Sequence, residues 1–195
     1  MGIAEYLKVD AYATIFLVGS DENLGKYRHP MPSNKPVRKT VLIHPGMRRY
    51  GQHCLITRMF TFGQPDEKLV RDYDFLNMLQ AHTLSMCKPG AKLGDIIESR
   101  RQLVYDSGYG AEWDMHYPGG FTEYFVGTAQ WGIDNEPIEE NMCLDWYLTV
   151  TGAKVEELVL ITNDGPDLLS VQGYWPTKKY TYNGQTFDLP DIRVL

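Results

Sequence analysis

Two pairs of adjacent glutamates, Glu139-Glu140 and Glu156-Glu157, have the residue type and spacing that suggest acid–base chemistry. Two carboxyl groups close to one another could act as a general acid and a general base. Both pairs are expected on strands, however, and neighbouring side chains on a strand point to opposite faces. We therefore expect each pair to place one glutamate inward and the other outward, which does not make a carboxylate dyad.

A second group of reactive side chains, His44, His53 and Cys54, combines imidazole and thiol groups that suit a soft metal ion. His53 and Cys54 are adjacent on an expected strand and should also diverge, so the simpler interpretation is a strand-end histidine and a buried thiol. With Cys87 and Cys143 the chain has three cysteines and no C-x-x-C pair, which is typical of free thiols in a reducing compartment. No serine lies in a nucleophile elbow, and no glycine-rich phosphate loop is present.

The elements that must position these side chains run from strands to helices and back to strands. β-branched and aromatic residues predict strands at residues 11–18, 40–44, 54–62, 142–150 and 154–162. Apolar residues at helical spacing predict helices at residues 66–87 and 93–107. Near the C terminus, Asn183-Gly184 between alternating residues predicts a hairpin over residues 180–187. This order favours an α+β fold in a single domain, residues 1–195, over a parallel βαβ array.

Charge and hydropathy exclude several classes of partner. The chain has 195 residues and a net charge of −6 at pH 7, with a sequence pI near 5.3. This acidic balance argues against binding to nucleic acid or to an anionic membrane surface. The N-terminal segment lacks the pattern of a secretory signal, and no apolar stretch approaches the roughly 18 residues of a membrane span. We therefore expect a soluble cytoplasmic protein without nucleic-acid or membrane partners.

The segment at residues 43–60, IHPGMRRYGQHCLITRMF, combines a hydrophobic strand, a glycine turn and an I-T-R-x-F strand. Four further blocks accompany it: a His-x-x-Pro loop at residues 28–34, a K-P-G turn at 87–91, a G-Y-G segment at 107–110 and a K-V-E-E block at 154–165. In this order and spacing the blocks resemble the pita-bread hydrolases, the family of methionine aminopeptidase, aminopeptidase P, prolidase and creatinase. The resemblance covers residues 11–170 and leaves residues 174–195 as a C-terminal extension with the hairpin.

The resemblance implies a pita-bread fold, in which a curved antiparallel sheet is backed by the helices at residues 66–87 and 93–107. It also implies that the usual first pair of helices is missing, because only about ten residues precede the first expected strand. The chain is then either a fragment or a form that covers its sheet by dimerising, since an uncovered sheet face would expose a large apolar patch. We expect a homodimer.

The metal site is where this sequence departs most from the family. A two-metal hydrolase of this type needs two aspartates, one histidine and two glutamates as ligands. The corresponding positions hold His44, Leu55, Gly120, no glutamate within residues 146–148, and Glu156. Asp145 lies close to the fourth position but is expected to face the wrong way. Since one ligand of five does not make a site, the resemblance implies that no metal or other cofactor is bound.

A small group of polar side chains remains from the family's pocket. The resemblance places His29, His116 and Glu156 as catalytic candidates, with substrate-binding roles for His44, Tyr117 and Glu157. A histidine suits acid–base work because its unperturbed pKa, near 6.5, lets it take and return protons at neutral pH. Equally, these residues could be relics held on a pocket wall by local hydrogen bonds.

Three functions are compatible with this partial site. The first is a divergent Xaa-Pro peptidase or creatinase relative, a pseudoenzyme without metallopeptidase activity that keeps a pocket for a small molecule or a peptide end. The second is a metal-free, creatinase-like hydrolase or lyase that acts on a small C–N substrate with His29 as its acid–base group. The third is a structural subunit that dimerises with itself or with a complete homologue. The family is one of hydrolases, but the residues leave open whether this chain keeps any catalysis.

Overall fold

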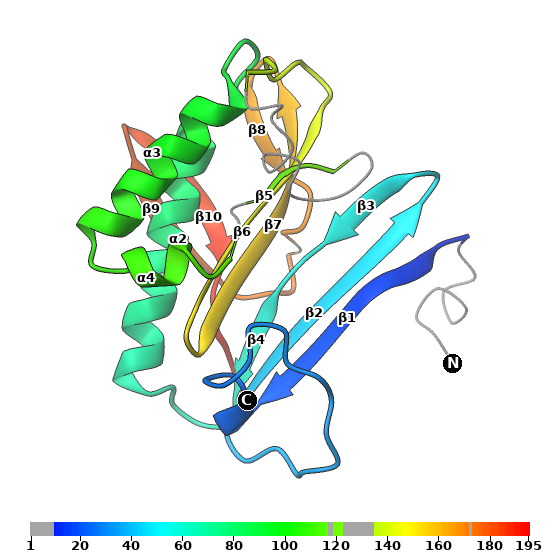
Figure 1. The fold of residues 1–195 in the computed structure, drawn as a ribbon, viewed down its shortest axis with the longest axis vertical. Helices are drawn as coiled ribbons and strands as arrows, with labels where there is room; N and C mark the ends of the chain where they lie inside the picture. The colour runs from blue at the N-terminus through cyan, green and yellow to red at the C-terminus, as the bar shows by residue number, and fades with distance from the viewer. Residues whose placement is uncertain (1–9, 117–118, 123–134, 172) are drawn as a thin grey trace.

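The computed structural model describes residues 10–116, 119–122, 135–171 and 173–195. Within these ranges the chain forms two sheets that meet along one side, two long helices packed on one of the sheets, and a C-terminal hairpin (Figure 1). Strands precede the long helices and follow them, in the order that the sequence predicts. The α+β class is therefore confirmed.

The first sheet contains the strands β1 (Tyr12–Ser20), β2 (Thr40–Arg49), β3 (Gln52–Leu55), β4 (Arg58–Thr61) and β11 (Arg193–Val194). Its order is β1-β2-β4-β11, and β3 pairs with the far end of β2. A two-residue turn at Tyr50-Gly51 joins β2 to β3, and both residues have the positive φ of a type I′ turn. β11 runs parallel to β4, so this sheet is not wholly antiparallel as the sequence led us to expect.

The strand predicted at residues 54–62 is divided into β3 and β4 because its ladder is interrupted. The N–H of Ile56 donates to the carbonyl of Pro45 on β2 at 3.4 Å, but proline has no N–H with which to return the bond. The next N–H, that of Thr57, donates instead to the carbonyl of Glu156 in the second sheet, at 3.2 Å. The chain is therefore joined to both sheets at this point.

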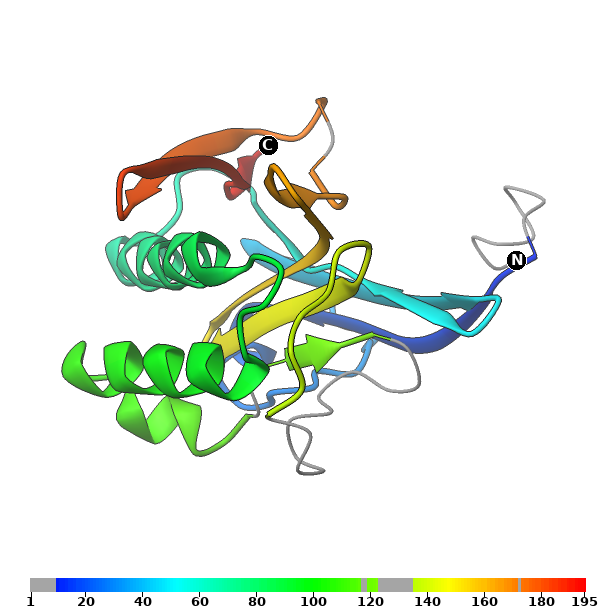
Figure 2. The same ribbon diagram turned by 90° about the horizontal axis from the view of Figure 1, so that it is seen from above.

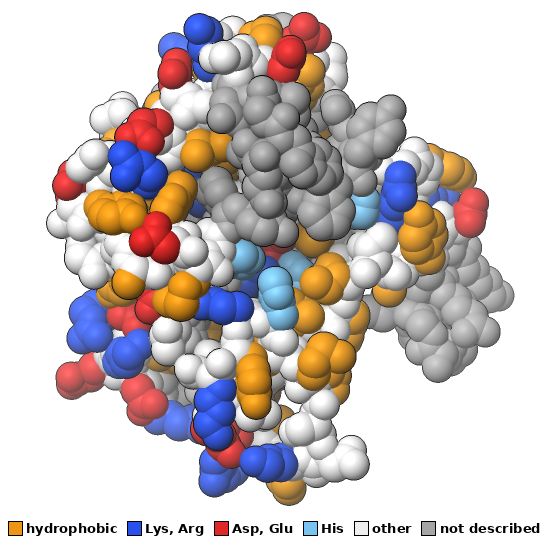
Figure 3. Space-filling model, viewed as in Figure 1, with side chains coloured by type: hydrophobic (Ala, Val, Ile, Leu, Met, Phe, Trp, Pro, Cys, Tyr) orange, Lys and Arg blue, Asp and Glu red, His pale blue; other side chains and the backbone are white. Residues whose placement is uncertain are grey.

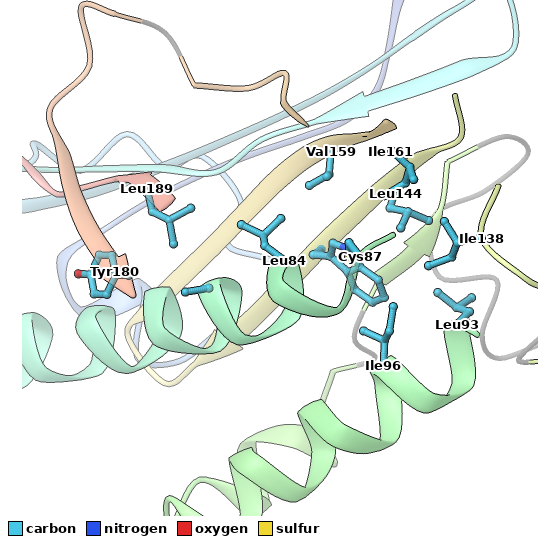
Figure 4. Packing of buried hydrophobic residues seen from close by; sticks show 12 residues of the cluster. Leu84, Cys87, Leu93, Ile96, Ile138, Leu144, Val159, Ile161, Tyr180 and Leu189 are labelled. Carbon is cyan, nitrogen blue, oxygen red and sulfur yellow. The ribbon is translucent and has the colours of Figure 1, made fainter. Parts of the chain in front are cut away.

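The second sheet has the order β5-β6-β7-β8, all antiparallel, and consists of β5 (Gly119–Phe121), β6 (Cys143–Val150), β7 (Ala153–Thr162) and β8 (Gly165–Leu168). The helices α2 (Glu67–Met86) and α3 (Leu93–Asp106) cover one face, and their apolar side chains form the core with those of β6 and β7 (Figures 2 and 4). Part of the other face lies against the first sheet, so β7 is buried on both faces.

Both long helices begin and end within one residue of the predicted bounds. The sequence did not predict the single-turn elements η1 (Asp21–Asn23) and α4 (Gly110–Trp113), because segments this short carry no periodic pattern. Within the described ranges, the chain has no helix with both the length and the apolar character needed to cross a membrane.

The C-terminal hairpin is confirmed as predicted. Its strands, β9 (Thr177–Tyr182) and β10 (Gln185–Pro190), are joined by Asn183-Gly184, whose φ angles of 48° and 76° are those of a type I′ turn. The hairpin packs on α2, where Nζ of Lys178 is 2.7 Å from Oδ1 of Asp74. Figure 2 shows that the hairpin and α3 lie on opposite sides of α2.

Substitution of Gly119 by alanine is expected to destabilise the fold strongly. Gly119 has a φ of +104°, and an added Cβ would lie 2.1 Å from the carbonyl oxygen of Asp145. The backbone of β6 cannot move away without breaking its pairing with β7, so we expect the free energy of unfolding to fall by about 3 kcal/mol or more.

Gly184→Ala is the matched control for this clash. Its φ is +76°, but no atom lies within 4 Å of an added Cβ. This variant should therefore show the backbone strain alone, about 1 kcal/mol. Urea unfolding measures both variants, and equal losses would show that contact with β6 is not the reason for glycine at position 119.

Candidate functional site

A pocket of about 250 Å³ lies where the two sheets meet. Its lining includes four of the chain's five histidines, His29, His44, His53 and His116. The remaining walls come from β1, β3, β6 and β7, through the side chains of Thr14, Ile15, Leu55, Tyr147, Lys154 and Glu156. Figure 3 shows histidine side chains grouped in the hollow between the two halves of the molecule. The pocket therefore concentrates imidazole groups, which can donate and accept hydrogen bonds.

The floor of the pocket is a buried, hydrogen-bonded group built around Glu156. This residue is 1% exposed, and its Oε2 atom lies 2.6 Å from Nδ1 of His44 on β2. The hydroxyl of Thr57 donates to the same oxygen at 3.0 Å and lies 3.1 Å from Nδ1 of His44. The short contact between His44 and Glu156 is that of a ring N–H donating to a carboxylate.

Lys154 adds a positive charge to this floor, and the sequence did not predict it as a site residue. Its side chain is 3% exposed, and Nζ lies 2.7 Å from Oε2 of Glu156. Nζ also lies 3.3 Å from Nδ1 of His44 and 5.2 Å from the centre of the Tyr147 ring. Lys154 stands two residues before Glu156 on β7, so side-chain alternation on a strand was the signal that could have found it.

Glu156 carries a negative charge in this setting. Burial alone would raise its pKa, but the charge of Lys154 and the contact with His44 outweigh burial and hold the pKa well below its usual range. The floor therefore contains a buried ion pair whose two charges compensate one another. Removing either partner alone would leave an uncompensated buried charge.

Asp145 lies on the same side of β6 and β7 as Glu156, contrary to the expectation that it faces the wrong way. The strand register places Asp145 opposite Leu158, and residues 156 and 158 share a face of β7. Its side chain is fully buried, and its carboxyl group interacts with that of Glu156 through charge and a side-chain hydrogen bond. Burial and the charge of Glu156 raise the pKa of Asp145 well above its ordinary value, which favours the neutral acid.

His29 and His116 form a second layer above the floor. Their rings meet edge to face, with centroids 5.4 Å apart, and the ring of His116 lies 4.9 Å from that of Tyr147. Nδ1 of His116 is 2.9 Å from the hydroxyl of Thr149. Burial and the nearby charge of Lys154 lower the pKa of His116 to about 3, and the same causes lower the pKa of His29. Both imidazoles are therefore neutral at pH 7.

Four of the six predicted site residues line this pocket: His29, His44, His116 and Glu156. Glu157 does not, because it lies on the opposite face of β7, where its carboxylate pairs with Arg58 at 2.7 Å. The structure thus places Glu157 away from the lining of this pocket, in an ion pair with Arg58. Tyr117 lies outside the described residues.

The expected split of each glutamate pair to opposite faces is wrong for Glu139-Glu140, and for Glu156-Glu157 it holds for the direction of the side chains but not for exposure. Both members of Glu139-Glu140 are exposed, because this segment is not a strand. The side chains of Glu156-Glu157 do point to opposite faces, but both faces of β7 are covered and both residues are buried. His53 and Cys54 diverge as predicted, although the histidine is buried and the thiol, expected inside, is exposed.

The donor set around Glu156 does not fit a pair of divalent cations. Leu55 and Gly120 bring no ligand atom, and Tyr147 rather than a carboxylate lies opposite Glu156 on β6. The ammonium group of Lys154 lies against the carboxylate that a metal ion would need. Across the described ranges, no three histidine, cysteine, aspartate or glutamate side chains are arranged to share a metal ion.

Comparison with known protein families gives a match to metallopeptidase family M24 over residues 2–163. The chain belongs to this family. Among curated proteins, this M24 chain is 27% identical over 157 residues to an uncharacterized peptidase of Staphylococcus saprophyticus, an alignment that covers 75% of the chain and 43% of that protein. The family predicted from the sequence blocks is therefore confirmed.

Two solved structures show the same fold. The M24 chain is similar to dipeptidase PepE from Mycobacterium ulcerans, with a TM-score of 0.69 and 17% identity over 93% of this chain and 47% of that one. It is also similar to prolidase from Pyrococcus furiosus, with a TM-score of 0.67 and 22% identity over 80% of this chain and 49% of that one. The pita-bread fold is thereby confirmed. The M24 chain spans less than half the length of each of these three relatives.

A larger groove of about 490 Å³ lies between the loop after β1, the start of α2 and the β6–β7 turn. The charged side chains that line it pair with one another, as Lys39 does with Asp66 and Lys68 with Asp72. Among the residues that the structure describes, no histidine or cysteine lines this groove. Groups that could do proton chemistry at neutral pH are therefore found in the smaller pocket.

Proposed function

We propose that this M24 domain uses its pocket to bind a small molecule or the end of a peptide without a dinuclear metal centre, and that it does not act as a metallopeptidase. The position of Lys154 carries the proposal, because its ammonium group lies 2.7 Å from the carboxylate of Glu156. Glu156 is the one position that keeps a ligand of the family's metal site, and here it is the counter-ion of a lysine. A metal ion would have to approach Glu156 against the charge of that ammonium group.

The size and lining of the pocket suit a small ligand with polar and apolar parts. Its volume, about 250 Å³, lies just below the usual range for drug-sized ligands. The neutral imidazoles of His29 and His116 can each donate and accept hydrogen bonds. Ile15 and Leu55 supply apolar wall, and Tyr147 contributes an aromatic ring. An amino acid or the end of a short peptide would satisfy both kinds of surface.

Metal analysis and ligand binding test this proposal on the purified wild-type chain. We expect substoichiometric manganese, cobalt, zinc and iron after expression in cells supplied with these metals. We expect some members of a panel of amino acids and dipeptides to raise the melting temperature, and His116→Ala to remove that gain. A stoichiometric metal ion in the wild-type protein would contradict the proposal.

His82→Ala is the matched control for the histidine substitution. His82 is buried like His116, but it lies between α2 and β9, with its ring against that of Tyr182. Its removal should lower the melting temperature of the free protein and leave the gain from ligand unchanged. If His82→Ala also abolished the gain, the assay would be reporting general stability and not the pocket.

A second candidate, metal-free acid–base catalysis on a small C–N substrate, is favoured by the state of His29. Its ring lines the pocket edge-on to His116, and its lowered pKa leaves a neutral base at pH 7. For such a substrate, His29→Ala should reduce turnover on the order of 100-fold or more. Turnover that survives this substitution would exclude His29 as the acid–base group.

A further inference from the structure

The strand β6 has an open edge where it continues past the end of β5. β5 pairs with residues 144–146 of β6. The carbonyl of Asp145 faces β5, because the site of an added Cβ on Gly119 lies against it. Backbone groups of alternate residues face the same edge of a strand, so the carbonyls of Tyr147 and Thr149 face this side as well. Within the described ranges, no strand covers this part of the edge.

Side chains take the place of a strand at the end of this edge. Arg28, in the loop between β1 and β2, donates from Nη1 to the carbonyl of Thr149, and its Nη2 pairs with the carboxylate of Glu112 on α4. Glu112 in turn accepts hydrogen bonds from the N–H and the hydroxyl of Thr151, at 3.1 and 3.3 Å. The two charged side chains are 19% and 18% exposed. This ion pair therefore satisfies backbone groups of the second sheet and joins the loop to α4 in a largely buried position.

The same ion pair holds both histidines of the layer above the pocket floor. His29 follows Arg28 in the loop, and its ring meets that of His116 edge to face, with centroids 5.4 Å apart. The N–H of His116 donates to the carbonyl of Trp113, at the end of α4, at 3.2 Å. Nδ1 of His116 lies 2.9 Å from the hydroxyl of Thr149, the residue whose carbonyl accepts from Arg28. The ion pair thus connects the backbone that carries one imidazole with the elements that carry the other.

The rest of the β1–β2 loop is anchored by other contacts. At its base, the carboxylate of Asp21 accepts from the N–H groups of residues 38–40, at 2.9, 2.8 and 3.1 Å. Residues 31–37 are exposed. Across the ranges that the structure describes, Arg28 makes the only hydrogen bonds and ion pair between this loop and β6 or α4. Loss of Arg28 therefore leaves His29 on a loop that has no polar link to the second sheet.

We propose that the ion pair of Arg28 with Glu112 is a positioning device, which fixes His29 against His116 and so keeps this wall of the pocket closed around a ligand. The inference rests on the ligand binding proposed for this M24 domain. A ligand that bonds to both imidazoles needs them at fixed places, and donors that are already ordered lower the cost of binding. When the pair is broken, the loop moves away from α4, His29 turns to solvent and His116 becomes accessible.

Histidine-directed labelling measures this positioning without a ligand. Diethyl pyrocarbonate acylates neutral imidazoles, and mass spectrometry of the peptides gives a labelling rate for each histidine. His116 is 9% exposed, so its labelling requires the pocket to open. We expect Arg28→Met to raise the labelling rate of His116 about fivefold or more. The buried His82, between α2 and β9, should be labelled at the wild-type rate in the same molecule, which distinguishes local opening from general unfolding.

The NMR titration of His29 provides a second readout, which a loss of stability alone would not change. Partial burial is the largest cause of the lowered pKa of His29, followed by the charge of Lys154. If Arg28→Met lets the ring turn to solvent, both causes weaken, and the pKa of His29 should rise toward 6.5.

Glu112→Met separates loop release from a direct effect of charge. Removing a carboxylate would lower the pKa of His29 if charge alone acted, whereas release of the loop raises it. Both Glu112→Met and Arg28→Met should therefore raise this pKa, and either variant serves if the other does not fold. Arg101→Met is the matched control, because Arg101 pairs with Glu98 on the exposed side of α3 at 2.6 Å. It should match the wild type in both readouts.

The proposal is overturned if either readout stays at its wild-type value in both variants, or if the pKa of His29 falls in Glu112→Met. It is also overturned if the labelling of His82 rises as much as that of His116, or if neither variant folds, because the pair would then support the fold as a whole. Amino acids and dipeptides that fail to stabilise the wild type would instead contradict the proposed function. Labelling needs no ligand, so the two failures are distinguishable.

Discussion

Replacement of Arg58 by methionine is expected to lower the free energy of unfolding by about 3–5 kcal/mol, because it leaves a buried carboxylate without its partner. Arg58 is 7% exposed and Glu157 is 3% exposed. The guanidinium group donates to both carboxylate oxygens of Glu157, at 2.7 and 3.2 Å, and to the carbonyl of Ser170 at 2.6 Å. This network connects β4 of the first sheet with β7 of the second, so its loss weakens the junction that forms the pocket.

The Arg58→Met/Glu157→Leu double variant separates charge burial from loss of contacts. Replacing both partners removes the uncompensated carboxylate, so the double variant should lose less stability than Arg58→Met alone. Urea unfolding followed by tryptophan fluorescence measures the difference. A double variant as unstable as the single one would show that packing, and not the ion pair, is what Arg58 supplies.

The pH dependence of Arg58→Met follows from the direction of the Glu157 shift. Burial raises the pKa of Glu157 even though Arg58 opposes it. The folded state therefore binds the proton more readily than the unfolded state, and this contribution to stability is present at low pH and lost as pH rises through the folded pKa. Without Arg58 the pKa rises further, so Arg58→Met should be less destabilised near pH 4 than at pH 8.

Acidification from pH 7 to pH 4 is expected to destabilise the wild type more than His116→Asn. Burial and the charge of Lys154 lower the pKa of His116 from 6.5 to about 3 in the folded state. A group with a depressed folded pKa contributes stability above its unfolded pKa, and that stability is lost as pH falls through the folded pKa. Each pKa unit corresponds to about 1.4 kcal/mol, so this histidine should lower the free energy of unfolding of the wild type by roughly 3 kcal/mol between pH 7 and pH 4.

The comparison with His116→Asn isolates this histidine from the other acid-sensitive groups. Glu156 also has a depressed pKa, so both proteins should lose stability as pH falls below about 4.5. The difference between them should develop mainly between pH 6.5 and pH 4, where only His116 distinguishes them. Thr149→Val removes the hydroxyl beside Nδ1 of His116 without removing the imidazole, so it should keep the wild-type pH dependence. Parallel stability curves for the wild type and His116→Asn would refute the assignment.

Local patterns were sufficient to predict much of the fold. The turn at Asn183-Gly184 requires positive φ at both residues, and that requirement is met by residue type alone. The apolar stripes of α2 and α3 extend over several helical turns, so the sequence predicts the ends of both helices to within one residue. The family followed from several blocks in the right order, because each block marks a backbone feature of the fold. The homodimer expected from the sequence stays a prediction.

The site could not be derived in the same way, because its contacts join distant parts of the chain. Lys154 meets His44 across 110 residues of sequence, and Arg58 meets Glu157 across 99. Side-chain alternation correctly separates the two glutamates of β7, but it cannot show that both faces of that strand are covered. The break between β3 and β4 depends likewise on Thr57, whose N–H finds its acceptor in the other sheet. The catalytic roles of His29, His116 and Glu156 also stay predictions.

The buried pairing of Lys154 with Glu156 has a consequence for how the domain responds to its surroundings. A bound ion stabilises a protein by mass action, in proportion to the logarithm of its free concentration, and it can be diluted, chelated or exchanged. An ammonium group that is covalently part of β7 is present at a fixed ratio of one per chain and cannot leave. The positive charge that balances Glu156 is therefore set by the amino-acid sequence and does not vary with the concentration of any metal ion.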